Sequence, residues 1–125
     1  MISANPIRIL IVDDDPDTTE ILAMLLRGPG REVQVCHSGT ECLELVGSFP
    51  PHLVLLDLRM PGIDGWETAR RLRRQHPSAM LIAITALSAE DDQRRSKEAG
   101  FFDHMVKPLR LDKLFPLLNR MAVAQ

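Results

Sequence analysis

Residues 53–62 have the sequence LVLLDLRMPG, in which four apolar residues lead into Asp57 and a proline–glycine turn follows soon after. Three other segments have the same layout. IRILIV (7–12) leads into three consecutive aspartates, MLIAI (80–84) leads into Thr85, and FFDHMV (101–106) leads into Lys107. Continuous runs of leucine and β-branched residues are typical of parallel strands that are buried on both faces. We therefore expect four strands of a parallel sheet at these positions.

A polar side chain or cluster follows each of these four segments. In open α/β sheets, the functional residues lie just beyond the carboxyl ends of the strands. The four segments would thus bring an acidic cluster, a single aspartate, a hydroxyl group and a lysine to one edge of the sheet. Such a set is suited to hold a divalent cation beside a phosphorylated carboxylate, with Asp57 as the central residue.

The composition is that of an ordinary globular domain. The chain has 125 residues, 45% of them hydrophobic, and a formal net charge of −2. These values predict one domain over residues 1–125, with its core at about residues 7–122, and no general attraction to nucleic acid or to an anionic membrane. No apolar stretch approaches the roughly 20 residues that span a bilayer, and Met1–Pro6 lacks the features of a secretory signal.

Two cysteines, Cys36 and Cys42, lie close together in the sequence. We interpret them as reduced packing residues rather than as a disulfide or a metal pair. This interpretation predicts a cytoplasmic location for the domain, without insertion into a membrane.

The segments between the strands begin with helix-capping residues. Asp15 precedes a proline, and Ser38, Asp64 and Ser88 are each followed three residues later by a glutamate or an aspartate. Such patterns are typical of helix N-termini. With a further short strand around Val33 and Val35, the chain alternates five times between a strand and a helix. This alternation predicts an α/β domain in which helices cover both faces of a doubly wound parallel sheet.

Helical spacing also predicts which side chains face the sheet. The expected inward residues are Ile21, Leu22, Leu25 and Leu26 in the first helix and Trp66, Ala69 and Leu72 in the third, where Arg70, Arg73 and Arg74 point outward. Glu90–Ala99 has almost no large apolar residue, so we expect this helix to be weakly anchored. Pro116 lies within the last helical segment, where we expect it to kink the helix or to delay its start.

Asp13, Asp14 and Asp57 are the predicted ligands of a metal ion. A carboxylate attacks a phosphorylated donor only when the repulsion between their charges is neutralised, which is usually the role of Mg²⁺ with oxygen ligands. Three acids at one edge would also repel one another without a cation. Asp15, in contrast, is predicted to cap the helix that follows, because Pro16 comes next.

Two other motifs overlap the acidic cluster and fit poorly. Aspartates at positions 13, 15 and 17 have the opening spacing of an EF-hand loop. That loop needs glycine at its sixth position and glutamate at its twelfth, and these are Thr18 and Met24 here. Residues 13–16 (DDDP) are also similar to the nucleophile motif of haloacid-dehalogenase-type phosphatases, but Asp17 interrupts that pattern.

Thr85 and Lys107 are predicted to bind the phosphoryl oxygens. A lysine ammonium supplies a point charge for them, and Pro108 directly after it fixes a tight turn, for which a cis peptide bond is one option. The arginine pairs at 70–71, 73–74 and 94–95 are offset by neighbouring acids. They predict a solvated helical face and no direct contact with nucleic acid.

Together these motifs closely resemble the receiver domain of two-component response regulators and hybrid histidine kinases, over essentially the whole chain. The matching segments are ILIVDDD (9–15), LLDLRMPGIDG (55–65), ITA (84–86) and VKP (106–108). The resemblance implies a flavodoxin-like fold with strand order 2-1-3-4-5. It further implies that a histidine kinase or a histidine phosphotransfer domain donates a phosphoryl group to Asp57.

The same resemblance implies the metal ligands. Mg²⁺ would be bound by Asp14, by the carboxylate of Asp57 and by the backbone carbonyl of Arg59. Asp13 would act on the ion largely through water.

Two further roles follow from the resemblance. Thr85 and Lys107 would bind the phosphoryl oxygens, and Thr85 would move toward them on activation. Arg59 and Leu87 would flank the path of the water that hydrolyses the phosphoryl group. The family usually has an aromatic switch residue three positions before the lysine, and this position is His104 here. We expect its imidazole to pack inward or to respond to pH.

The leading interpretation is a signalling domain, not an enzyme, that changes its affinity for partners when it is phosphorylated and loses the group slowly by itself. Two alternatives stay open. One is a phosphohydrolase with an aspartyl-phosphate intermediate, which would need a second acid or base near Asp57; the other is an interaction module that keeps only the fold.

The expected partners are a histidine kinase or phosphotransfer domain, and a downstream protein or second copy that docks on the fourth and fifth helices. The chain is expected to be a single-domain regulator or a receiver from a longer protein, such as the cytoplasmic part of a membrane-bound hybrid kinase.

Overall fold

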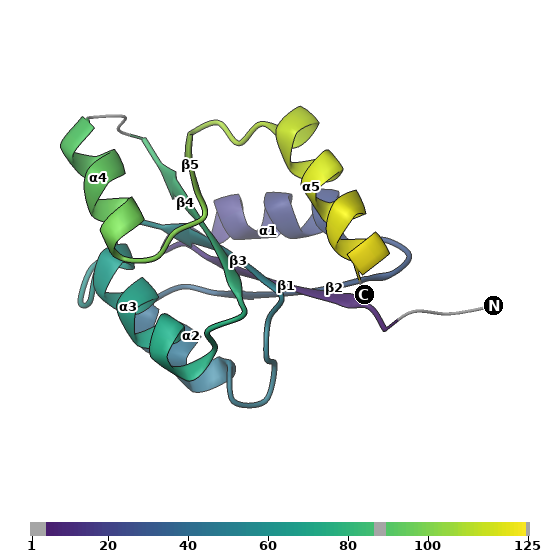
Figure 1. Ribbon diagram of the computed structural model, residues 1–125, viewed down its shortest axis with the longest axis horizontal. Coiled ribbons are helices and arrows are strands. Elements are labelled where there is room, and N and C mark those ends of the chain that lie inside the picture. Colours follow the sequence, from purple (N-terminus) through teal and green to yellow (C-terminus); the bar gives the residue numbers. More distant parts are fainter. Residues whose placement is uncertain (1–4, 87–89, 125) are drawn as a thin grey trace.

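The computed structural model describes residues 5–86 and 90–124, which form a five-stranded parallel sheet with helices on both faces (Figure 1). The strands are β1 (Ile7–Val12), β2 (Arg31–Cys36), β3 (Leu53–Asp57), β4 (Met80–Thr85) and β5 (Asp103–Val106). The helices are α1 (Pro16–Leu26), α2 (Gly39–Leu45), α3 (Gly65–Gln75), α4 (Glu90–Glu98) and α5 (Leu111–Ala124). The strand order β2-β1-β3-β4-β5 confirms the expected doubly wound α/β fold.

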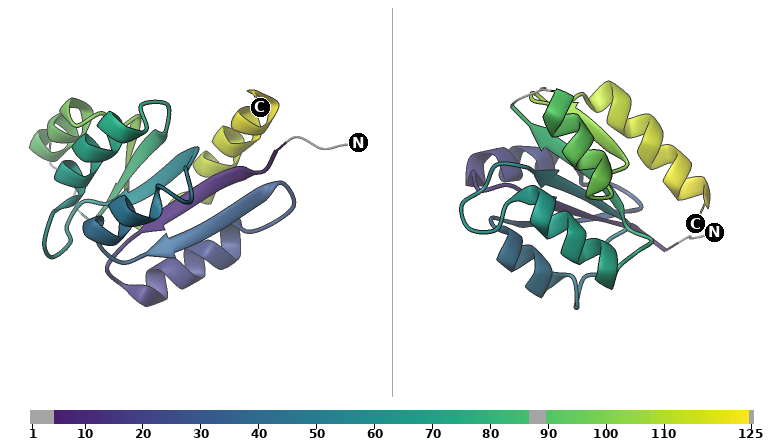
Figure 2. Two further views of the ribbon diagram at one scale, coloured as in Figure 1. Left: turned by 90° about the horizontal axis from the view of Figure 1, so that it is seen from below. Right: turned by 60° about the vertical axis from the view of Figure 1, so that its left-hand side comes forward.

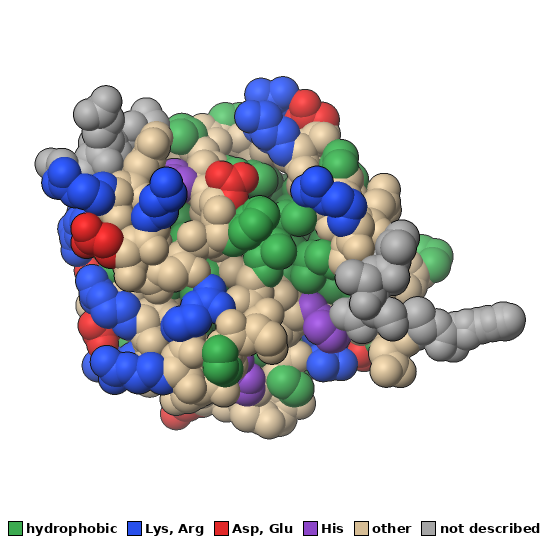
Figure 3. Space-filling model, in the orientation of Figure 1, with side chains coloured by type: hydrophobic (Ala, Val, Ile, Leu, Met, Phe, Trp, Pro, Cys, Tyr) green, Lys and Arg blue, Asp and Glu red, His purple; other side chains and the backbone are tan. Residues whose placement is uncertain are grey.

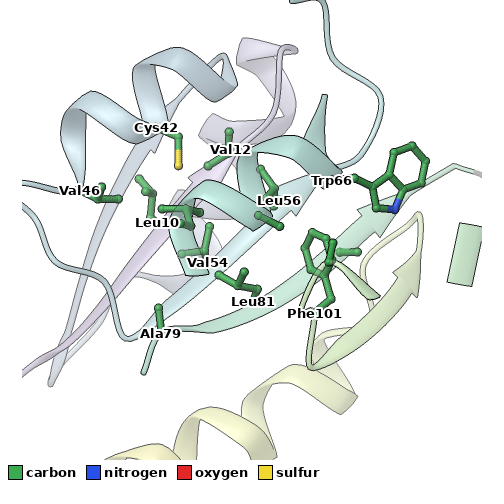
Figure 4. Packing of buried hydrophobic residues seen from close by; sticks show 14 of the residues in the cluster. Leu10, Val12, Cys42, Val46, Val54, Leu56, Trp66, Ala79, Leu81 and Phe101 are labelled. Carbon is green, nitrogen blue, oxygen red and sulfur yellow. The ribbon is translucent and has the colours of Figure 1, made fainter. Parts of the chain in front are cut away.

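The sheet separates two hydrophobic layers, because alternate residues of each strand point to opposite faces. On one face, Ile9 and Leu55 pack with residues of α1 and α5. On the other face, Leu10 and Val54 pack with residues of α2 and α3 (Figure 4). Figure 2 shows these helices from two further sides. The continuous apolar runs of the strands are thus explained by burial on both faces.

The buried face of α1 differs from the expected one. Ile21 and Leu25 are 58% and 47% exposed, whereas Thr19, Ala23 and Leu26 are buried. The buried residues follow one another at intervals of four and three, so they form a continuous stripe along the helix. The helix has two candidate apolar stripes, and the one with smaller residues at its centre faces the sheet. The expectation that Ile21 and Leu25 face inward was therefore wrong.

Helix α3 buries Trp66, Ala69 and Leu72 as expected, but Arg73 does not point freely outward. Its guanidinium donates hydrogen bonds to the carbonyl oxygens of Pro77 (2.6 Å), Ala79 (2.9 Å) and Gly100 (2.5 Å). These carbonyl groups lie just after the C-terminal ends of α3 and α4, so no N–H group of a helix donates to them. Arg73 therefore joins the ends of two helices.

A glycine follows α4, and a proline lies within α5. Gly100 has a φ of +98°, the left-handed conformation that glycine commonly adopts just after a helix. Helix α5 begins at Leu111, so Pro116 does not delay its start. Pro116 is exposed, and water can reach the carbonyl that the missing N–H leaves without a partner.

Lysine and arginine side chains gather over α3 and α4, as Figure 3 shows. Arg70 and Arg71 form ion pairs with Glu67 at 3.1 and 2.9 Å, which agrees with the interpretation of this surface as a solvated face whose charges are balanced. Cys36 and Cys42 are free and buried, as expected of packing residues. No helix within residues 5–86 and 90–124 is long and apolar enough to cross a membrane.

Arg73→Ala is expected to lower the free energy of unfolding by about 1–3 kcal/mol, because partly buried carbonyl groups lose their charged donor. Arg74→Ala is the matched control, since Arg74 is an exposed neighbour on the same helix, and it should change stability by less than about 0.5 kcal/mol. Urea unfolding of both variants measures the difference. Equal effects of the two substitutions would contradict a structural role for Arg73.

Candidate functional site

The register of the strands places the predicted residues side by side at the carboxyl edge of the sheet. Val12 is paired with Leu56, so Asp13 lies next to Asp57. The β3–β4 register continues this edge to Thr85, the last residue of β4. Lys107 follows β5 directly, and its N–H donates to the carbonyl of Thr85 at 2.7 Å. Parallel pairing alone therefore assembles the site.

Three carboxylates converge at this edge. Asp13, Asp14 and Asp57 each offer an oxygen atom, and these three atoms lie within 4.8 Å of one another. Asp13 and Asp57 are buried, whereas Asp14 is exposed. Two buried oxygen donors and one at the surface suit a hard divalent cation that keeps several of its waters. The donor set thus fits Mg²⁺.

Asp15 stands apart from this cluster. Its carboxylate accepts hydrogen bonds from the Asp17 N–H (3.1 Å) and from the Thr18 hydroxyl (2.7 Å). The Thr18 bond and then the Asp17 bond lower the pKa of Asp15. The structure confirms the predicted role of Asp15 as the N-cap of α1.

Lys107 supplies the positive charge of the site. Its Nζ lies 2.9 Å from Oδ2 of Asp13 and 3.8 Å from Oδ2 of Asp57. Burial opposes the charged form of the ammonium, but the hydrogen bond to Asp13 and the negative charges of Asp57 and Asp13 prevail and raise the pKa of Lys107. The next peptide bond, to Pro108, is cis, as one option of the sequence interpretation allowed.

The carboxylate of Asp57 is less completely hydrogen-bonded than that of Asp13, the other buried carboxylate at this edge. Oδ1 of Asp57 accepts a long hydrogen bond, 3.3 Å, from the N–H of Arg59. Burial and then the charge of Asp13 raise its pKa to about 6, although Lys107 acts in the opposite direction. Both oxygens of Asp13, in contrast, are bonded, one to Lys107 and one to the N–H of Asp15 (3.0 Å). Asp57 is therefore the buried carboxylate with the most capacity for a new bond.

Gly65 packs closely against the backbone at the end of β3, a contact that the sequence interpretation did not anticipate. Its N–H donates to the carbonyl of Leu58 at 3.0 Å, so α3 begins directly against the end of β3. A Cβ atom at this position would lie 2.7 Å from Cα of Leu58 and would clash with the carbonyl oxygen of Asp57. Glycine is thus required by this close approach.

The two predicted switch residues lie in different surroundings. Thr85 is fully buried at the end of β4. His104 lies on β5 beside a hollow of about 510 Å³ between α4 and β5. Both of its ring nitrogens are buried and find no hydrogen-bond partner among the described residues, so the imidazole does pack inward, as one expectation stated.

Arg59 makes contacts that the sequence interpretation missed. Its guanidinium bonds both carboxylate oxygens of Asp92 at 3.2 Å and lies 5.0 Å from the centre of the Trp66 ring. The other residue expected to control water access, Leu87, lies outside the described residues. Polar residues at 92 and 96, one turn apart in α4, were the signal in the sequence for this polar packing.

Replacing Asp57 by asparagine is expected to stabilise the metal-free protein at pH 7. A folded-state pKa raised from 3.8 to about 6 means that stability is fully present below pH 3.8 and is lost as the pH rises through 6. Asp57→Asn removes this loss, so it should raise the free energy of unfolding by about 1–3 kcal/mol at pH 7 and by much less at pH 4. Urea unfolding in EDTA measures this, with Glu20→Gln on the exposed side of α1 as the control. A gain that does not depend on pH would disprove the explanation.

Comparisons with known proteins agree with this geometry. Residues 9–119 match the family described as the response regulator receiver domain. The chain is 35% identical over 116 residues to the transcriptional regulatory protein TcrA of Mycobacterium tuberculosis, a match that covers 93% of this chain and 46% of TcrA. The chain therefore spans less than half the length of that relative.

Solved structures show the same fold. A CheY-like receiver domain protein from Methanospirillum hungatei has a TM-score of 0.87 at 24% identity, over 96% of both chains. The BeF3-activated N-terminal receiver domain of Klebsiella pneumoniae RstA has a TM-score of 0.83 at 30% identity, over 94% of this chain and 99% of that chain. On this evidence, the chain belongs to the response regulator receiver domain family, the phosphoacceptor domains of two-component systems.

Proposed function

We propose that Asp57 is the phosphoacceptor of this receiver domain. One of its carboxylate oxygens forms the bond to phosphorus while the bond from phosphorus to an imidazole nitrogen of the donor histidine breaks. The observation that carries this proposal is the position of the buried Asp57 carboxylate beside Asp13 and the Lys107 ammonium, with its oxygens only weakly engaged. The oxygens of Asp13 are already bonded, and those of Asp15 cap a helix.

Asp13, Asp14 and Asp57 would hold Mg²⁺ together with the backbone carbonyl of Arg59. The three converging carboxylate oxygens support this assignment. Receiver domains bind Mg²⁺ at an acidic pocket of this kind. When bound, the ion supplies the charge neutralisation that lets an anionic donor approach an anionic acceptor.

Thr85 and Lys107 would bind the oxygens of the phosphoryl group after transfer. Lys107 is already held within 3.8 Å of Asp57, and Thr85 lies at the end of the neighbouring strand. Thr85 would move toward the phosphoryl group on activation. His104 would take the position of the aromatic switch residue, and the hollow beside it gives its imidazole space to change rotamer.

The domain would act in signalling without catalytic turnover and would lose its phosphoryl group slowly. Receiver domains interact with histidine kinases or phosphotransfer proteins and with output domains. For this chain we propose a cytoplasmic location, a histidine kinase or histidine phosphotransfer domain as the phosphoryl donor, and a downstream protein or second copy that docks on the face of α4 and α5. We also propose that residues 1–125 act as a single receiver domain.

Incubation with acetyl phosphate and Mg²⁺ tests the phosphoacceptor. The wild type should gain the mass of one phosphoryl group as an adduct that is labile in base, and Asp57→Asn should gain less than about a tenth of it, because the amide is not a nucleophile. Asp103→Asn, at an exposed position of β5, is the control and should be labelled like the wild type. Rapid turnover of acetyl phosphate without accumulation of the adduct would indicate a phosphohydrolase instead, and neither turnover nor adduct would indicate an interaction module.

Mg²⁺ affinity should depend on Asp14 far more than on Asp15. Asp14→Ala is expected to weaken binding at least about tenfold, since lost metal ligands cost no less than lost supporting contacts. Asp15→Ala should change affinity less than about twofold, yet lower the free energy of unfolding through loss of the cap. Titration of Trp66 fluorescence with Mg²⁺ measures the affinities. The reverse order of the two effects would show that the roles of Asp14 and Asp15 are misassigned.

A further inference from the structure

Helix α4 is attached to α3 through polar contacts that meet at Trp66. Among the described side chains of α4, which are those of residues 92–98, the buried ones are Asp92 and Ser96, one turn apart on the inner face. The indole N–H of Trp66 donates to the Ser96 hydroxyl at 3.2 Å, and the Arg95 guanidinium lies 3.7 Å from the ring centre. Figure 4 shows the indole at the margin of the hydrophobic cluster, away from Leu10 and Val54. Because polar contacts depend on matched partners, a change of partner can shift this helix.

The buried carboxylate of Asp92 depends on Arg59. Asp92 is only 6% exposed, and both of its oxygens are bonded by the Arg59 guanidinium at 3.2 Å. Among the described residues, no other cation lies within ion-pair distance of Asp92. A buried carboxylate that loses its cation is strongly unfavourable. The present position of α4 is therefore coupled to the position of the Arg59 side chain.

Arg59 also belongs to the candidate phosphorylation site. Its N–H donates to the carboxylate of Asp57, two residues earlier, while its side chain is 54% exposed and therefore has room to move. The face of Trp66 beneath the guanidinium remains a favourable surface during such movement. A phosphoryl group on Asp57 would carry more negative charge and more acceptor oxygens than a carboxylate, and arginine binds such groups in a bidentate manner.

We infer that Arg59 is shared between two anions, Asp92 before phosphorylation and the phosphoryl group on Asp57 afterwards. Asp92 is then a positioning residue, because it holds Arg59 away from the phosphoryl site. The departure of Arg59 leaves Asp92 buried without a cation, and α4 shifts until this carboxylate reaches water. The inference rests on the proposed phosphorylation of Asp57, and it assigns the link between that site and α4 to one arginine.

Asp92→Asn tests this link in the full chain, phosphorylated with acetyl phosphate and Mg²⁺. The asparagine needs no cation, so phosphorylation should leave α4 in place. The change in amide hydrogen exchange of residues 90–98 and the change in Trp66 fluorescence should both fall below about a third of the wild-type values. Phosphoryl uptake should be unchanged, and the phosphoryl group should persist about threefold longer, because Arg59 no longer divides its time with Asp92. Glu98→Gln removes the same charge from an exposed position of α4 and should behave like the wild type.

Arg59→Gln tests the other side of the pair and keeps the inference testable if Asp92→Asn does not fold. It should also abolish the response of α4, since Asp92 lacks its cation from the start, but it should shorten the phosphoryl lifetime. These opposite changes in lifetime distinguish positioning from a merely structural role. Either of two results would overturn the inference alone. One is normal phosphoryl uptake with a wild-type response of α4 in either variant. The other is a phosphoryl lifetime that changes in the same direction in both variants. Failure of the wild type to take up any phosphoryl group would overturn the proposed function as well.

Discussion

The close approach of two buried carboxylates to one ammonium is the interaction on which the rest of the site depends. Asp13 and Asp57 are neighbours because β1 and β3 pair in parallel with Val12 opposite Leu56, and Lys107 reaches them from the end of β5. Burial raises the pKa of Asp57, and the charge of Asp13 raises it further, because one ammonium does not balance two carboxylates. The site is thus short of positive charge in a way that a divalent cation would correct.

The same edge of the sheet separates the roles of adjacent acids. Both oxygens of Asp13 accept hydrogen bonds, Asp14 faces solvent, and Asp15 caps a helix. These differences arise from where the strand ends and the helix begins, because the chain turns between Val12 and Pro16 and directs each successive side chain differently. Three identical residues in a row therefore acquire three environments, and only Asp57, on the next strand, combines burial with free bonding capacity.

Helix α4 is held by a different principle from the other helices. Helices α1, α2, α3 and α5 place apolar side chains against the sheet, and such packing tolerates little displacement. The inner face of α4 instead carries Asp92 and Ser96, whose partners Arg59 and Trp66 lie on or next to α3. Exchange of polar partners can be driven by a local change of charge. On the proposed function, α4 is the element that converts a signal that enters as charge into a change of shape.

Local pattern in the sequence was sufficient to determine the class of the fold, the strands, the helix caps at Asp15, Ser38 and Asp64, and the residues that gather at the carboxyl edge. Each of these follows from short-range periodicity or from the direction of parallel strands. Only the tertiary structure decided which face of α1 is buried, that Arg73 joins the ends of α3 and α4, and that Arg59 and Asp92 meet across 33 positions of the chain. The rotation of a helix against a sheet and the pairing of distant charges depend on the packed whole, and the sequence around each residue does not contain that information.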